Sequence, residues 1–249
     1  MALFGLFGSK EERDRAALRK LAGKVMERYG PPENRQKAIQ QLGELGTPGA
    51  LEALLLRFTV HVDPGITDDE EKETTRGLLV EAGPAAIEPI DKFVREQEDG
   101  IAWGLRVLAD LAPPEKVREV VVRELERLGK VYTRDPEKKL VLLKWLTEHH
   151  AGAGGAEVEG ALLPLLEDFS DDVRISTTRA LAALAPGEPA RDALIQLLLR
   201  DRDNARVRGE VLEALAGIGA DVKGHRPSVE ALLVEPFFLD REGHVKKRG

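Results

Sequence analysis

The sequence predicts an all-α fold in which about six helical hairpins stack on one another after an N-terminal cap helix. Three observations carry this prediction. A leucine recurs in a similar setting at a period of roughly 30 to 40 residues, which is typical of helical repeats. Glycine or proline follows most of these copies, where a turn is needed, and a second apolar stripe with helical spacing comes next.

The composition is that of a folded helical protein. Of 249 residues, 42% are hydrophobic, and only seven Phe, two Trp and two Tyr are present, so the core consists mainly of Leu, Ala and Val. The absence of Cys excludes disulfides, thiolate zinc sites and cysteine nucleophiles. It also fits a reducing compartment, so we expect a cytoplasmic protein.

The N-terminal segment, residues 1–30, contains the expected cap helix. Ser9 and Glu12 have the spacing of a capping box, and the following helix carries Leu18, Leu21 and Val25 on one stripe. The apolar residues 1–8 precede it and are too short for a signal peptide or a spanning helix. We expect them to cover the first repeat; peripheral contact with an anionic membrane surface, or docking on a partner, is the alternative.

First helices of the hairpins are predicted from the recurring leucine. The aligned positions are Leu42, Leu79, Leu108, Leu143, Leu181 and Leu215. A basic residue stands seven positions earlier in four of the six copies, at Arg35, Lys72, Arg174 and Arg208. The third and fourth copies have Ile101 and Pro136 there and depart from the pattern.

Turns and second helices follow each copy. Gly46, Gly83 and Gly219 stand where a helix end adopts a left-handed conformation, and prolines come shortly after several copies. The apolar stripes that follow, such as "ALEALLLRF" and "ARDALIQLLLR", predict second helices, the last one shortened. This gives an array over residues 31–235, and residues 236–249 form a C-terminal cap and a basic tail, "HVKKRG", expected to be disordered.

The stretch "DDVRISTTRALAALAPGEPARDALIQLLLRDRDNARVRGEVLEALAGIG" resembles two successive HEAT repeats, and the likeness extends more loosely from Glu33 to Val234. The resemblance implies a right-handed α-solenoid. In that family an Asp and an Arg of stacked first helices form a ladder, and the resemblance assigns this role to Asp172 with Arg174 and to Asp203 with Arg208. It implies a fold and not a reaction.

Three motifs resemble metal or phosphate sites, and each has a simpler interpretation. "EHH" at 148–150 places its side chains on different sides of a helix end, "DDEEKETT" at 68–75 suits the acidic first turn of a helix, and "GAGGAEVEG" lacks the strand and the lysine of a phosphate loop. The HEAT-class enzyme deoxyhypusine hydroxylase holds iron with His-Glu pairs, and this sequence has no His-Glu dipeptide. We therefore expect no metal, no cofactor and no catalytic residue.

Second helices line the concave face in the family that the chain resembles, and they supply the candidate binding residues Lys92, Arg95, Arg123, Glu124, Arg127 and Arg200. Acidic residues are mixed with them, and the formal net charge is −7, so we do not expect a nucleic-acid partner. The sequence favours a non-catalytic adaptor that holds a protein or peptide. The alternatives left open are a HEAT-like DNA glycosylase of the alkylpurine type and a protein similar to the phycobilin lyases.

Overall fold

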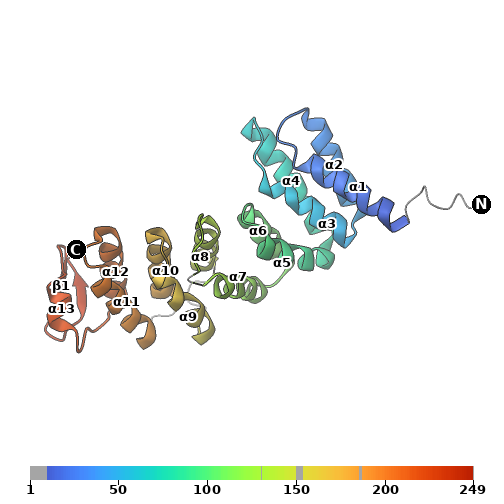
Figure 1. The fold of residues 1–249 in the computed structure, drawn as a ribbon. Coiled ribbons are helices and arrows are strands. Elements are labelled where there is room, and N and C mark those ends of the chain that lie inside the picture. The colour runs from blue at the N-terminus through green and yellow to red at the C-terminus, as the bar shows by residue number, and fades with distance from the viewer. Residues whose placement is uncertain (1–9, 130, 150–153, 185–186, 249) are drawn as a thin grey trace, which may run out of the picture. The chain divides into compact units, whose positions relative to one another are not determined.

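A computed structural model describes residues 10–129, 131–149, 154–184 and 187–248 of the chain (Figure 1). The apolar residues 1–8, His150 and Pro186 lie outside these ranges, and so do the sequence-based expectations that rest on them. The chain forms two compact units, Met1–Val117 and Arg118–Gly249, and each is treated by itself below. Among the described helices, none is both long enough and apolar enough to cross a membrane.

The N-terminal unit consists of a cap helix and successive helical hairpins. Helix α1 packs against α2 and α3, the first helices α2, α4 and α6 stack in order, and the second helix α3 packs against α5. The bounds are α1 Lys10–Val25, α2 Pro32–Leu45, α3 Pro48–Leu55, the 3₁₀ turn η1 Leu56–Thr59, α4 Gly65–Glu81, the 3₁₀ turn η2 Gly83–Ala86, α5 Ile87–Glu96 and α6 Ile101–Leu111.

The predicted turn chemistry is present at the end of α2. Gly46 has φ 55°, in the left-handed region, and its N–H donates to the carbonyl oxygen of Leu42. Thr47 then caps α3 by accepting a hydrogen bond from the backbone N–H of Ala50, and Pro48 occupies the first turn of α3. One helix therefore ends and the next begins within three residues.

The aligned leucines lie in the hydrophobic core of both units. All six side chains are fully buried, which confirms the register that the sequence predicts. In the N-terminal unit Phe58 stacks on Trp103 at a ring-centroid separation of 5.5 Å and meets Phe93 edge to face. Trp103 thus fills space between helices, as expected for an aromatic residue beside a core position.

The C-terminal unit is also built from helical hairpins. Its first helices α8, α10 and α12 lie side by side (Figure 1), and the second helix α11 packs against η3 on one side and α13 on the other. The bounds are α7 Pro114–Leu128, which begins before the division between the units, α8 Glu137–His149, α9 Ala156–Leu162, the 3₁₀ turn η3 Leu163–Glu167, α10 Asp171–Leu184, α11 Glu188–Arg200, α12 Ala205–Gly217 and α13 Arg226–Glu230.

The basic tail is not disordered, and that prediction is wrong. Strands β1 Phe237–Leu239 and β2 Val245–Lys247 form an antiparallel hairpin with Leu239 opposite Val245, and β2 packs against α12. Val245 is fully buried, and the turn is closed by Gly243 at φ 92°. We attribute the order of the tail to the turn at Gly243 and to Val245, whose strand covers part of the surface of α12.

Candidate functional site

Five buried charged residues form an ion cluster in the N-terminal unit. We call Arg35, Arg57, Asp68, Glu71 and Lys72 the N-terminal ion cluster; each residue is at most 4% exposed. Glu71 lies 3.0 Å from Nε of Arg35 and 2.9 Å from Nε of Arg57. Asp68 lies 2.7 Å from both Arg57 and Lys72. The cluster joins α2, η1 and α4, so it ties one hairpin to the next.

Helix α4 brings the acidic residues of the cluster inward. Asp68, Glu71, Lys72 and Thr75 have the i, i+3, i+4, i+7 spacing of one helix face, and all four are buried. Asp69, Glu70 and Glu73 point outward. The interpretation of "DDEEKETT" as acidic residues in the first turn of a helix holds for Asp68, which lies in the first turn of α4, although its side chain faces inward and is buried. The helical spacing itself is the signal that could have identified the buried face.

The cluster sets the ionisation of Asp68. Burial raises the pKa of its carboxyl group, but hydrogen bonds from Lys72 and Arg57, together with their positive charges, outweigh burial and hold the pKa below its ordinary value. The backbone N–H of Val62 also donates to Asp68, at 3.2 Å. The folded protein therefore favours the ionised carboxylate more strongly than the unfolded chain does.

Acid is expected to weaken the N-terminal unit through Asp68. Since the folded pKa lies below the unfolded one, this stabilisation is complete above the unfolded value of about 4 and is lost as the pH falls through the folded value. Urea unfolding at pH 2 to 6, followed by Trp103 fluorescence with Trp145 changed to Phe, measures the effect. We expect Asp68→Asn to flatten the profile and Asp69→Asn to preserve it; parallel wild-type and Asp68→Asn profiles would assign the effect elsewhere.

In the C-terminal unit, two first helices carry near their start a buried or partly buried cation with the same kind of contacts. Lys139 at the start of α8 donates to the carbonyl oxygen of Val131 in the preceding loop and pairs with Asp168 after η3, at 2.6 Å. Arg174 in α10 likewise donates to the carbonyl oxygens of Asp168 and Phe169 and lies 2.9 Å from Asp201, after α11. We call this arrangement a cation clamp: one cation binds the loop before its helix and the acid that ends its hairpin.

The predicted ladder uses other partners than the resemblance implies. Asp172 pairs with Arg206 at 2.6 Å, not with Arg174, and so it does link the stacked helices α10 and α12. The pair of Asp203 with Arg208 is not formed: the Asp203 side chain is 96% exposed beside Arg202, and Arg208 donates to the carbonyl oxygen of Arg202. The reason is geometric, because the loop before α12 turns Asp203 outward while the guanidinium of Arg208 reaches back to that loop.

Candidate residues of the second helices fall in both units, and most of them have partners within the chain. In the N-terminal unit Lys92 pairs with Glu52 at 2.6 Å and Arg95 lies 3.7 Å from Glu96. In the C-terminal unit Arg123 lies 3.7 Å from Glu119, and Arg200 lies 3.0 Å from Asp201 and donates to the carbonyl oxygen of Leu166. Side chains that are already paired present little net charge to a partner.

Glu124 is not a surface residue, which corrects its place among the candidates. It is 4% exposed and binds Lys138 at 2.9 Å and Arg127 at 2.6 Å. Lys138 is itself buried at the start of α8. Glu124 therefore joins α7 to α8 through an ion pair, and only Arg127 of this trio reaches solvent, with a half-exposed side chain.

A groove of about 290 Å³ lies along the second helices of the N-terminal unit. Helices α1, α3 and α5 line it, with Leu18, Leu56 and Phe93 as apolar contributors and Lys92 and Glu52 at its charged side. Of the predicted binding residues, Lys92 is therefore placed in a concave surface. The ion pair between Lys92 and Glu52 leaves that groove nearly neutral.

A larger groove, of about 770 Å³, crosses the first helices of the C-terminal unit. Its apolar floor includes Leu140, Val141 and Ile175, and Ser176 lies among them. Charged residues of α8, α10 and α12 form the rim, where Arg179 pairs with Glu210. We call this surface the first-helix groove. The sequence reasoning missed it because it searched for binding residues on the second helices alone.

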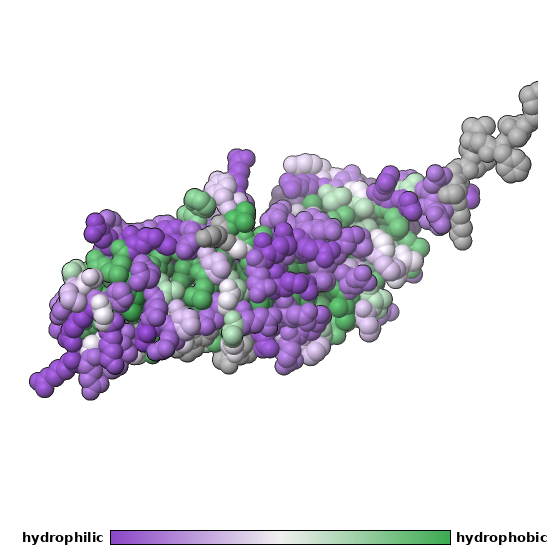
Figure 2. Space-filling model, turned by 60° about the horizontal axis from the view of Figure 1, so that its bottom comes forward, coloured by the Kyte–Doolittle hydropathy of each residue, from purple (hydrophilic) through white to green (hydrophobic). Residues whose placement is uncertain are grey.

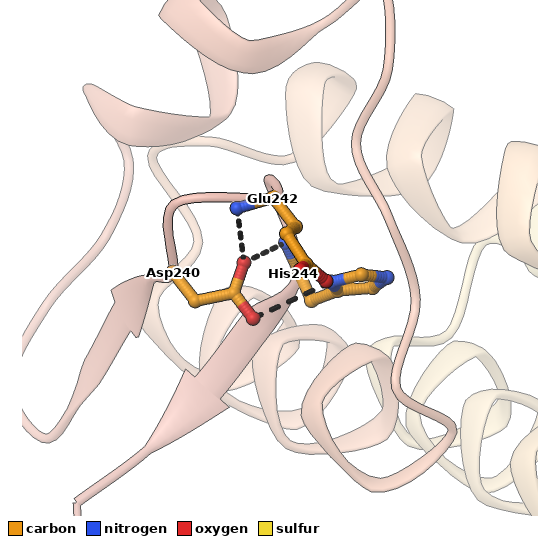
Figure 3. Close-up of side chains that lie close together, drawn as sticks. All are labelled: Asp240, Glu242 and His244. Atoms are coloured by element: carbon orange, nitrogen blue, oxygen red, sulfur yellow. Dashed lines mark hydrogen bonds and ion pairs between the residues drawn. The ribbon is translucent and has the colours of Figure 1, made fainter.

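The turn between β1 and β2 gathers the donors Asp240, Glu242 and His244 within 4.8 Å of one another (Figure 3). Nδ1 of His244 lies 3.3 Å from Asp240 and 3.8 Å from Glu242. The other oxygen of Asp240 accepts the backbone N–H groups of Glu242 and His244, and these hydrogen bonds lower the pKa of Asp240. The same bonds that close the turn account for the proximity of the three side chains.

His149, from the "EHH" motif, contacts Trp145 of its own helix at the end of α8. Its ring stacks on Trp145 at a centroid separation of 4.0 Å, and Nδ1 lies 3.0 Å from the carbonyl oxygen of Trp145. His150 lies outside the described residues. The contacts of His149 are those of a side chain that covers a helix end.

The comparisons with known proteins agree with the repeats seen in the C-terminal unit. Residues 159–237 match the family model of HEAT repeats. This part of the chain belongs to the HEAT-repeat family. The match spans the end of α9 and the hairpins α10–α11 and α12–α13, so the cation clamp of Arg174 lies inside a HEAT repeat.

Two solved structures share about a fifth of their residues with the chain. Human deoxyhypusine hydroxylase in complex with glycerol is 20% identical over 89% of this chain and 90% of its own, with a TM-score of 0.31. An engineered protein is 20% identical over 82% of this chain and 80% of its own, with a TM-score of 0.37. No curated protein matches the sequence.

Proposed function

We propose that this HEAT-repeat protein is a non-catalytic scaffold that holds a segment of a partner protein in the first-helix groove of its C-terminal unit. The observation that carries the proposal is the groove itself, which runs across successive repeats and combines an apolar floor with a charged rim. Repeat arrays of this kind bind partners along such continuous surfaces. A buried apolar anchor with a polar rim is also the anatomy of protein interfaces.

The face drawn in Figure 2 is consistent with a partner that is recognised by a few anchors. On the face drawn in Figure 2, hydrophilic residues predominate and hydrophobic residues show between them in separate, smaller areas. Interfaces on surfaces of this kind obtain most of their affinity from a small number of well-packed side chains. The apolar groove floor at Val141 and Ile175 offers a place for such an anchor.

Filling the groove tests the proposal. Ser176→Arg places a long side chain among the floor residues, and Ser228→Arg adds the same side chain at an exposed position of α13. Affinity capture from native cell extract at two salt concentrations, followed by mass spectrometry, compares the two variants with the wild type. We expect one protein complex to be retained by the wild type and by Ser228→Arg, and to fall at least tenfold with Ser176→Arg.

Two outcomes would contradict the proposal. Equal retention of the complex by both variants would place the partner on another surface. Recovery of nucleic acid that higher salt releases would favour the DNA-processing class instead, because phosphate contacts weaken steeply with salt.

A further inference from the structure

The loops that precede the first helices of the C-terminal unit form a second exposed surface, with a regular construction. We call it the loop edge: Val131 and Tyr132 before α8, Phe169 before α10, and Arg202 before α12. A cation of the following helix holds each loop by a backbone carbonyl oxygen; the cations are Lys139, Arg174 and Arg208 respectively. These hydrogen bonds fix the loops, so their outward side chains are presented in defined positions.

Two exposed aromatic rings stand next to each other on the loop edge. Tyr132 and Phe169 are 65% and 73% exposed, and their rings meet edge to face at a centroid separation of 5.5 Å. Val131, which is also 65% exposed, adjoins Tyr132. Aromatic rings on a fixed backbone lose little entropy on binding, and such rings are enriched among interface anchors.

Among the described residues, Arg208 has no acid in the place that Asp168 takes beside Lys139 and Asp201 takes beside Arg174. Lys139 has Asp168 29 residues later, and Arg174 has Asp201 27 residues later. Glu235 stands 27 residues after Arg208, but its side chain is 92% exposed and lies 3.6 Å from Arg248 instead. Within the described residues, the guanidinium of Arg208 has the carbonyl oxygen of Arg202 as its acceptor, and its buried Nε has none.

From these observations we infer that the loop edge binds an extended segment of a protein partner that carries an apolar residue and, beyond it, a carboxylate. The apolar residue packs on Tyr132 and Phe169, and the carboxylate binds the guanidinium group of Arg208. This inference rests on the proposed function, because the occupant is a protein segment.

The spacing of the loops defines the segment further. Stacked helices lie about 8–10 Å apart. An extended chain in the polyproline II conformation advances about 3.1 Å per residue and brings every third side chain to the same face, so one repeat corresponds to about three residues. The recognised pattern is therefore an apolar residue followed three positions later by Asp or Glu. Side chains at such a spacing reach Phe169 and Arg208, because the loops that they belong to precede the successive first helices α10 and α12.

Fluorescence anisotropy with two labelled, capped peptides tests the inference on the full chain. One peptide carries phenylalanine followed three positions later by glutamate, and the other carries glutamine in place of the glutamate. We expect the wild type to bind the glutamate peptide at least tenfold more tightly. Arg208→Gln is expected to remove that preference, whereas Arg241→Gln, which removes the same charge from an exposed position of the β-hairpin turn, should change neither affinity more than twofold.

Several results would overturn the inference. These are equal affinity of the wild type for the two peptides, an equal loss of affinity in Arg208→Gln and Arg241→Gln, and the absence of binding at millimolar peptide. Phe169→Ala serves as a second variant: it should weaken both peptides at least fivefold, and unchanged affinities would contradict the role of the aromatic pair. Failure here leaves the first-helix groove untouched, because Ser176→Arg tests that surface separately.

Discussion

Glu71→Gln is expected to lower the free energy of unfolding of the N-terminal unit by about 3–5 kcal/mol, the range for breaking a buried ion pair. Glu71, in α4, is 2% exposed and neutralises two arginines of the preceding hairpin, Arg35 in α2 and Arg57 in η1. Glutamine fits the same space but carries no charge. The variant therefore leaves Arg57, which is fully buried, with Asp68 as its acidic partner.

Glu73→Gln is the matched control on the same helix. Glu73 also contacts two arginines, Arg76 and Arg106, but its side chain is about half exposed. Exposed pairs contribute about 0–1 kcal/mol, so this variant should unfold close to the wild type. Equilibrium urea unfolding in a Trp145→Phe background, with Trp103 as the reporter, measures both. Equal losses for Glu71→Gln and Glu73→Gln would show that burial of the cluster does not set its contribution.

The repeat architecture could be predicted from the sequence because it depends on local and periodic features. Leu42 and its five counterparts recur in one register, and Gly46 and Thr47 carry turn and cap chemistry that acts within a few residues. A hairpin of this kind is specified mostly by its own residues and its nearest neighbours. The β-hairpin at Phe237–Lys247 was missed because its short strands are stabilised by packing on α12, which no local pattern indicates.

The candidate surfaces were less predictable, because they depend on which charged side chains are buried. Glu124 and Arg127 look equivalent in the sequence of α7, yet Glu124 is buried against Lys138 while Arg127 reaches solvent. Lysine side chains are usually exposed, so the sequence alone predicts Lys138 and Lys139 at the surface, yet both are buried. Long-range pairing decides these cases, and spacing along one helix does not reveal a partner that is some 30 residues away, such as Asp168 for Lys139.

Lys139→Met is expected to lower the free energy of unfolding of the C-terminal unit by about 3–5 kcal/mol, because it leaves the carboxylate of Asp168 buried without its cation. The variant also removes the hydrogen bond to the carbonyl oxygen of Val131, 2.7 Å away. Lys144→Met, on the same helix, is the control: its side chain is 74% exposed and lies 3.9 Å from Glu148. Urea unfolding in a Trp103→Phe background, with Trp145 as the reporter, compares them.

A double variant separates the two roles of this lysine. Asp168→Asn removes the uncompensated charge and keeps a side-chain oxygen for the backbone N–H of Ser170, so Lys139→Met with Asp168→Asn should recover at least half of the lost stability. It does not restore the bond to Val131, which holds the loop that carries Tyr132. We therefore expect the double variant to regain stability without regaining affinity for the phenylalanine peptides. Recovery of both together would mean that the clamp supports the fold alone and does not position the loop edge for a partner.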